Sequence, residues 1–187
     1  MREEKAKLRG SPGNGEKTPV MAYGCLFCKT GREERVAEQI RSVCPEVQTT
    51  TMRQLKYRTH NGEKCLEESL LLPSYVFFRG PAGLEPAAFP KQHLIRVLSV
   101  DGKDWRLQGD DLRFVQWLFR QRGLLGVSQA CQEGDRVRIL SGPLKDLEGS
   151  VRRVDRRGRS GQVVLSFRGR EISVWLGFEW VAKPDGA

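Results

Sequence analysis

The sequence predicts two domains: an α+β domain with an antiparallel sheet flanked by helices, followed by a small all-β barrel. Residues 21–122 combine short apolar strands with two amphipathic helices, a mixture typical of α+β domains. Residues 133–183 show no helical periodicity and contain short apolar runs separated by glycines, as in small barrels. Residues 123–132 lie between them with weak periodicity and two glycines, and we expect them to form a linker.

The ends of the chain are expected to lie outside this fold. Residues 1–20 predict a disordered basic tail, because the run Gly-Ser-Pro-Gly-Asn-Gly within it favours neither helix nor strand. Met21 is an alternative start of the functional chain. Residues 184–187 are expected to form a short C-terminal tail.

The first domain opens with a strand and a helix. Residues 23–29 are apolar and rich in aromatic and cysteine side chains, which predicts a buried strand. Thr30 and Glu33 have the spacing of a capping box at the start of a helix. One face of this helix then carries apolar side chains at i, i+4 and i+7, and Pro45 ends it. These apolar positions are Val36, Ile40 and Val43.

A strand-rich stretch follows the first helix. Residues 47–58 are rich in threonine and predict an extended segment, and Asn61-Gly62 then predicts a hairpin turn. The hairpin returns along residues 64–70. Two further strands are expected at residues 75–79 and 95–100, separated by a Gly- and Pro-rich loop.

Residues 110–122 predict a second helix whose apolar surface is unusually wide. Two acids open it, where the helix dipole favours negative charge. Its apolar side chains cover an arc of roughly 220°, whereas about 100° suffices for a surface helix. We expect the surplus to face either the second domain or a helix of a partner. The apolar residues are Leu112, Phe114, Val115, Trp117, Leu118 and Phe119.

The second domain is expected to consist of short strands only. Residues 135–140 alternate between apolar and polar positions and predict its first strand. Further strands are expected at residues 151–154, 162–167 and 171–176 and at the terminal pair 180–181. We expect a stable barrel.

Composition makes an enzyme the less favoured class. The net charge of +9 and the pI of 9.6 indicate a polyanionic partner. Five cysteines without a secretory signal suggest free thiols in the cytoplasm. Cys25 and Cys28 would point to opposite sides of a strand, which argues against a zinc site. No phosphate-binding or dinucleotide-binding glycine motif occurs, and we predict no cofactor, no metal, no catalytic residues and no transmembrane helix.

Residues 133–155 resemble a KOW motif, which is found in small SH3-like barrels. The resemblance rests on residues at the family's spacing. These are Gly134, Asp135, Val137, Ile139, Gly142, Pro143, Gly149 and Val151. Because ribosomal proteins also carry this motif, a structural RNA-binding protein is one alternative interpretation.

Two segments of the first domain distinguish between the protein classes that carry a KOW motif. The segment Lys29–Glu34, which leads from a strand into a helix, resembles the opening of a NusG N-terminal (NGN) domain. Residues 71–80, Leu-Leu-Pro-Ser-Tyr-Val-Phe-Phe-Arg-Gly, are similar to another strand of that domain. The two resemblances together cover residues 22–182, and the chain is identified as resembling NusG-family transcription elongation factors.

This resemblance implies a function in transcription. NusG proteins bind the clamp helices of RNA polymerase through an apolar patch on the NGN domain. Carried over to this chain, the patch would contain Tyr75 and Phe77 on one strand and Phe114 and Trp117 on the second helix. The implied partner is an elongating RNA polymerase, bound by a monomer that does not associate with membranes.

The chain departs from housekeeping NusG in ways that resemble the LoaP antiterminators. Leu144 stands where housekeeping NusG usually has a phenylalanine used for termination-factor and ribosome contacts, and Lys29-Thr30-Gly31 replaces the usual Lys-Pro-Gly. We therefore expect processive antitermination. The alternative is a housekeeping elongation factor whose KOW domain binds a ribosomal protein or a termination factor.

Basic side chains predict where nucleic acid binds. Residues 152–170 contain seven arginines and one aspartate. Isolated arginines usually form a solvated surface, but this density favours pairing with phosphates and stacking on bases. We expect nascent RNA, including a structured hairpin, to contact Lys145, Arg152, Arg153, Arg156, Arg157, Arg159, Arg168 and Arg170. We also expect contact with non-template DNA through Arg32, Arg35 and Arg41 on the first helix.

Overall fold

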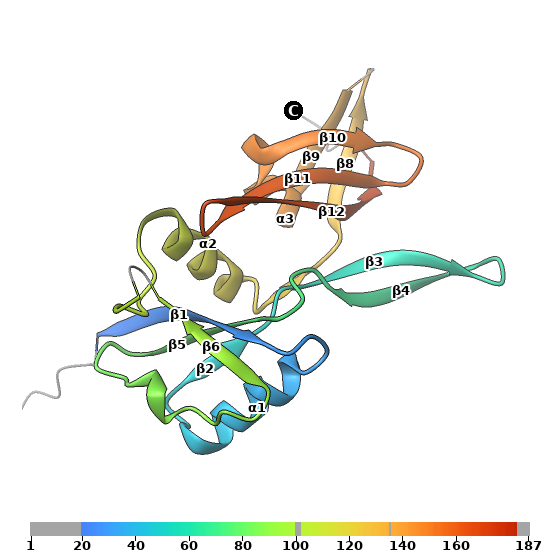
Figure 1. The fold of residues 1–187 in the computed structure, drawn as a ribbon. Helices are drawn as coiled ribbons and strands as arrows, with labels where there is room; N and C mark the ends of the chain where they lie inside the picture. Colours follow the sequence, from blue (N-terminus) through green and yellow to red (C-terminus); the bar gives the residue numbers. More distant parts are fainter. Residues whose placement is uncertain (1–19, 100–101, 135, 183–187) are drawn as a thin grey trace, which may run out of the picture.

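The computed structural model describes residues 20–99, 102–134 and 136–182. An α+β domain comes first and an all-β barrel follows, as the sequence predicts (Figure 1). The predicted tails lie outside the described residues, apart from Val20. No helix among the described residues is long and apolar enough to cross a membrane.

A four-stranded antiparallel sheet forms the centre of the first domain. Its strands lie in the order β2-β5-β1-β6. Their bounds are β1 Met21–Cys28, β2 Gln48–Thr50, β5 Tyr75–Pro81 and β6 Leu94–Leu98. The helix α1, Glu33–Val43, packs on one face of this sheet (Figure 1). The short 3-10 helix η1, Pro86–Ala88, lies in the loop between β5 and β6.

The start of α1 differs from the predicted capping box. Arg32 is the N-cap residue and makes no side-chain capping bond. Glu33 instead accepts a 2.7 Å hydrogen bond from the backbone N–H of Ser74, while the Thr30 hydroxyl lies 2.7 Å from that of Ser74. The prediction was wrong because a loop distant in sequence supplies the partners. Val43, predicted on the buried face, is 59% exposed.

A long hairpin extends from the first domain beneath the barrel (Figure 1). It consists of β3, Arg53–His60, and β4, Glu63–Leu70. Asn61 and Gly62 have φ values of 52° and 86°, which confirms the predicted Asn-Gly turn. The short strand β7, Leu124–Leu125, pairs in parallel with the base of β3.

The second helix, α2, lies between the sheet of the first domain and the barrel (Figure 1). It spans Gly109–Arg120, close to the predicted range. Asp110 and Asp111 occupy its first turn, as expected from the helix dipole. Its buried side chains belong to the same apolar cluster as the barrel interior.

The barrel sheet has the strand order β10-β11-β12-β8-β9, in which only the β8–β12 pair is parallel. The strands are β8 Ser128–Glu133, β9 Arg136–Ser141, β10 Val151–Asp155, β11 Ser160–Phe167 and β12 Arg170–Trp180. The last two predicted strands are one continuous strand. Contrary to the expectation of strands only, one helical turn, α3 (Pro143–Asp146), and the 3-10 helix η2 (Glu148–Ser150) follow β9.

The segment 123–132, expected to be a linker, is structured. It contains β7, which belongs to the sheet of the hairpin, and most of β8, which belongs to the barrel. The two domains are therefore joined by only the residues between these strands. One apolar cluster runs from the face of the first sheet through α2 into the barrel interior, so the domains share a hydrophobic core.

Candidate functional site

The four residues expected to bind polymerase come together on one face of the first domain. Tyr75 and Phe77 lie on β5, and Phe114 and Trp117 lie on α2. The ring centroids of Phe77 and Phe114 are 6.0 Å apart, and those of Phe114 and Trp117 are 6.1 Å apart. The tertiary structure thus builds one aromatic patch from two segments that are distant in sequence.

The barrel covers this aromatic patch. The ring of Phe167, at the end of β11, lies 5.4 Å from Phe77, 5.4 Å from Phe114 and 6.1 Å from Tyr75 between centroids. Phe77 is fully buried, and Trp117 is only 7% exposed. The surplus apolar arc of α2 therefore faces the second domain, one of the two alternatives that the sequence left open.

Hydrogen bonds flank the apolar interface between α2 and the barrel. The backbone N–H of Arg168 donates a 2.8 Å hydrogen bond to Asp111, and the Arg168 guanidinium donates a 2.9 Å bond to the carbonyl of Ser99. On the other side of α2, Asp146 accepts hydrogen bonds from the Trp117 indole, at 3.0 Å, and from Gln121, at 2.8 Å. These bonds hold α2 against the barrel at two separate points.

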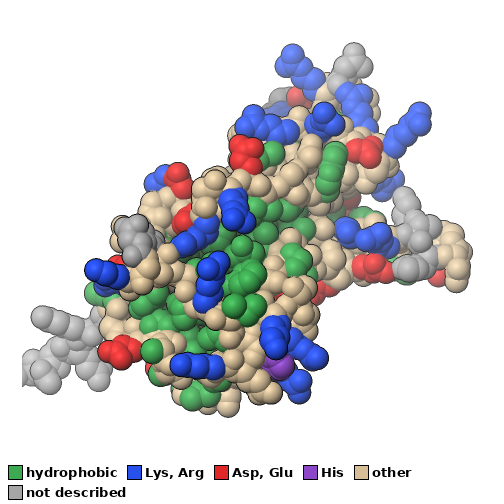
Figure 2. All heavy atoms as spheres, in the orientation of Figure 1, with side chains coloured by type: hydrophobic (Ala, Val, Ile, Leu, Met, Phe, Trp, Pro, Cys, Tyr) green, Lys and Arg blue, Asp and Glu red, His purple; other side chains and the backbone are tan. Residues whose placement is uncertain are grey.

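Five of the predicted RNA-binding arginines gather at one end of the barrel. Arg152 and Arg153 are exposed on β10, and the next three are exposed in the loop between β10 and β11, namely Arg156, Arg157 and Arg159. Asp155 shapes this loop by accepting bonds from the backbone N–H groups of Arg157, at 3.0 Å, and Gly158, at 2.9 Å. Figure 2 shows lysine and arginine side chains projecting from the barrel.

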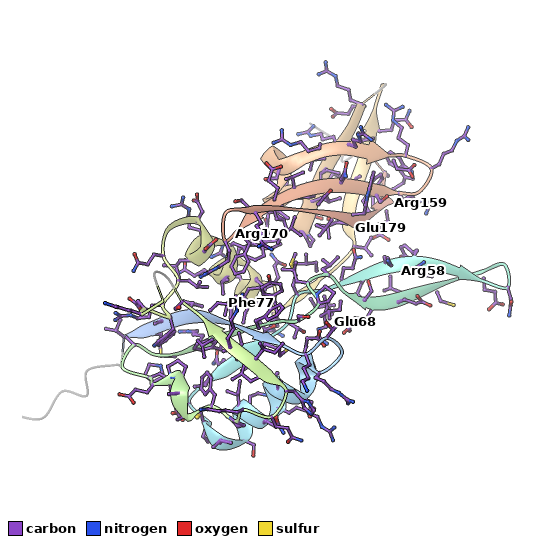
Figure 3. All side chains as sticks on the ribbon, in the orientation of Figure 1. Arg58, Glu68, Phe77, Arg159, Arg170 and Glu179 are labelled. Atoms are coloured by element: carbon purple, nitrogen blue, oxygen red, sulfur yellow. The ribbon has the colours of Figure 1, made fainter. Side chains whose placement is uncertain are left out.

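The other predicted RNA-binding residues lie elsewhere. Arg170 lies at the opposite end of the barrel strands from Arg159 (Figure 3), and the eight residues of β11 between them span roughly 25 Å. Arg168 is half-buried because it bonds to the first domain. Lys145 is exposed on α3. The seven arginines of residues 152–170 thus do not form one surface.

The arginines of α1 belong to a second basic region that includes a residue not foreseen. Arg32 and Arg35 are exposed, whereas Arg41 bonds to Glu34 at 3.0 Å and to Thr49 at 2.8 Å. His93 lies close by because its carbonyl accepts a 2.9 Å bond from the N–H of Lys29. Desolvation, followed by the positive charges of Arg32, Lys29 and Arg35, lowers the pKa of His93. No local sequence signal links His93 to α1.

Leu144, the residue from which we expected a departure from housekeeping NusG, lies in the barrel core. Its side chain is fully buried and packs closely over Gly161. Its backbone N–H donates a 3.0 Å bond to the hydroxyl of Ser128. In this structure the side chain at this position is thus part of the core and does not form an exposed contact surface.

The two cysteines of the Cys-x-x-Cys segment lie on opposite faces of β1, as predicted. Cys25 belongs to the apolar cluster shared with the barrel, and Cys28 belongs to the cluster under α1. Desolvation, with a smaller effect from Glu33, raises the pKa of the Cys28 thiol to about 11. Within the described ranges, no group of three or more His, Cys, Asp or Glu side chains could hold a metal ion.

Comparisons with known proteins found a sequence motif and two similar proteins. Residues 133–166 match the KOW motif. The chain is 29% identical to the transcription termination/antitermination protein NusG of Thermus thermophilus over 135 residues, which cover 65% of this chain and 72% of the relative. It is also similar to a solved structure described as "Domain interaction in Thermotoga maritima NusG", with a TM-score of 0.47 and 19% identity over 84% of this chain and 94% of the other. The barrel thus contains the KOW motif, and over about two thirds of its length the chain is similar to NusG, a transcription termination/antitermination protein.

Proposed function

We propose that this protein binds elongating RNA polymerase through its NGN domain and promotes processive antitermination, in the manner of the LoaP proteins. The observation that carries the proposal is the convergence of Tyr75, Phe77, Phe114 and Trp117 on one aromatic patch. An apolar patch of this kind suits a helical partner such as the polymerase clamp helices. The protein would act as a monomer in the cytoplasm, where transcription takes place.

Polymerase binding requires the barrel to move. Phe167 contacts three of the four patch residues, and Asp146 bonds to the fourth. A clamp helix and the barrel therefore compete for the same side chains. Contacts with the polymerase would have to offset the loss of this interface, and the free protein would be mostly closed.

The exposed arginines support a role for the KOW domain in binding nascent RNA. Arg156, Arg157 and Arg159 lie in a loop whose backbone is held by Asp155. The three guanidinium groups therefore extend from one ordered loop and can pair with phosphates. A loop of this kind can contact the phosphates of a structured RNA hairpin. Arg32 and Arg35, together with Lys29, would contact non-template DNA on the other side of the NGN domain.

A transcription assay tests the proposal. Elongation complexes on a template with an intrinsic terminator are supplied with the protein, and terminator read-through is measured. We expect read-through to rise, and to rise less with the Tyr75→Ala/Phe114→Ala variant. Ile95→Ala, at a side chain that is 55% exposed and outside the patch, is the matched control.

Two results would contradict the proposal. The absence of binding to elongation complexes would exclude a polymerase-bound factor. Polymerase binding without read-through, combined with capture of a ribosomal protein or a termination factor by the KOW domain, would identify a housekeeping elongation factor instead.

A further inference from the structure

A cleft of about 570 Å³ lies where the hairpin of the NGN domain meets the barrel. One wall is β3, and the other is β12 with the loop between β10 and β11. The two walls approach closely at its edge, where the carbonyl oxygen of Leu55 lies 3.8 Å from the position that a Cβ atom on Gly177 would take. Its volume is within the range of about 300–1,000 Å³ typical of ligand sites.

Two aromatic side chains line this cleft without being buried by the fold. Tyr57 on β3 is 44% exposed, and Trp175 on β12 is 43% exposed. The neighbours of Trp175 along β12, Val174 and Leu176, point into the barrel core, so Trp175 lies on the solvent side of the strand. Exposed aromatic rings on facing walls are typical of surfaces on which nucleobases stack.

The cleft is also positively charged. Lys56, Arg157 and Arg159 line it, and no Asp or Glu occurs among the described residues that do so. The arginine loop is held in shape by the two backbone hydrogen bonds that Asp155 accepts and by a 2.8 Å bond from the Phe178 N–H to the Arg159 carbonyl. This arrangement favours an anion such as a phosphate at the mouth of the cleft.

A buried amide group gives the cleft a means of binding a base edge. Gln54, on β3, lines the cleft and is only 5% exposed. Its Oε1 atom has no hydrogen-bond partner among the described residues. Buried polar atoms normally have a partner, and the N–H groups of a nucleobase would supply one.

We infer that this cleft binds single-stranded nucleic acid, with one unpaired base against Tyr57 and Trp175 and its flanking phosphates near Arg157 and Arg159. A base within a duplex is stacked on both sides and could not enter. The inference rests on the proposed function, because it gives the arginine loop a defined ligand. It adds that the NGN hairpin forms half of the single-strand site.

Because each domain supplies one wall of the cleft, binding of a nucleic-acid strand is coupled to the relative position of the two domains. A bound strand contacts both walls and therefore favours the closed arrangement. When the barrel leaves the NGN domain, it retains Trp175 and the arginines but loses Tyr57, Lys56 and Gln54. Affinity for a single strand should then fall without vanishing.

Fluorescence anisotropy with the full chain and labelled octanucleotides tests the inference. The probes are octauridylate, octathymidylate and an RNA hairpin. The only unpaired bases of this hairpin lie in its tight loop. Trp175→Ala and Tyr57→Ala should each weaken binding of the single strands about 5- to 150-fold, and Gln54→Leu about two- to tenfold. Trp175→Phe, which retains an aromatic ring, should have an intermediate effect.

The matched control is Leu66→Ala, an exposed apolar residue on the hairpin that does not line the cleft; it should bind as the unmodified chain does. Preference for octauridylate over octathymidylate would identify RNA as the ligand, and equal affinity would support a site for either strand. Equal or tighter binding of the RNA hairpin would overturn the inference. If arginine variants weaken binding but the aromatic variants do not, the cleft is excluded while the proposed RNA contact stands. If neither set has an effect, both fail.

Discussion

The ring of Phe167, from the barrel, lies 5.4 Å from the ring of Phe77, in the sheet of the first domain, in an edge-to-face arrangement. Both side chains are almost fully buried. Phe77, one of the residues predicted to contact polymerase, is therefore part of the protein's own core.

Phe167→Ala should uncouple the two domains. Loss of a buried phenylalanine typically costs about 3–5 kcal/mol, and here the lost contacts lie on both sides of the interface. We expect calorimetry to show a lower melting temperature and two separate transitions. Val154→Ala, at a 41% exposed position of the same barrel, should leave the melting profile nearly unchanged. One unaltered transition in Phe167→Ala would show that the interface does not stabilise the fold.

Asp111→Ala combined with Asp146→Ala should increase polymerase binding. The two substitutions remove three hydrogen bonds between the domains and leave the aromatic patch intact. If the barrel competes with polymerase, affinity for elongation complexes should rise at least about tenfold.

The neighbouring acid provides a control for this variant. Asp110 lies in the same turn of α2 but pairs with Arg113 of its own helix. Asp110→Ala should not change the affinity. A double variant that binds polymerase no more tightly than the unmodified chain would refute competition between barrel and polymerase.

Replacing Arg156, Arg157 and Arg159 with alanine should weaken RNA binding and reduce its salt dependence. Each lost phosphate contact lowers the slope of log K against log salt by about 0.7 for a single strand, so three contacts account for about 2. Filter binding at several salt concentrations measures this slope. Arg170→Ala removes an arginine at the opposite end of the barrel (Figure 3) and should have a smaller effect than Arg157→Ala alone. An equal effect of these two single variants would indicate a diffuse electrostatic attraction.

His93 should titrate below the ordinary histidine pKa of about 6.5. Desolvation and the charges of Arg32, Lys29 and Arg35 lower the pKa of His93 in the folded chain. The unfolded chain then binds more protons near pH 6, so the free energy of unfolding should fall as pH falls through this range. Proton NMR of the imidazole measures the titration, and His93→Gln assigns the signal.

Two variants test the origin of this shift. Arg32→Ala should raise the pKa of His93, as should added salt, which screens the charges. Arg41→Ala should not, because Arg41 already pairs with Glu34 and Thr49. A His93 pKa that does not respond to Arg32→Ala would exclude this basic cluster as its cause.

Local patterns predicted most elements well, and failures arose where a distant segment decided the outcome. Asn61-Gly62 formed the expected turn because positive φ values are local preferences of these residues. Thr30 and Glu33 did not form a capping box, since Ser74 offered both side chains a partner 40 or more residues away. The segment 123–132 was predicted to be a linker because its strands have no sequence pattern of their own and form by pairing with β3, β9 and β12.

The candidate site likewise combines features that the sequence predicts with features that depend on distant segments. The wide apolar arc of α2 indicated from sequence that this helix had a second contact, but not whether the contact was the barrel or a partner. Arginine content likewise predicted a basic barrel, yet β11 separates Arg159 from Arg170 by its whole length. No sequence pattern links Tyr57 with Trp175, because the two residues come from different domains.

The sequence by itself determined the two domains, their order, the family resemblance and the excess of positive charge, because these depend on composition and on periodicities within short segments. Only the tertiary structure decided that Phe167 covers Phe77 and Phe114, and that the hairpin and the barrel enclose a cleft. Both features arise from apolar and polar surfaces of two domains meeting in three dimensions. This interface depends on the shapes of the two folded surfaces, and no pattern within a short segment of sequence determines those shapes.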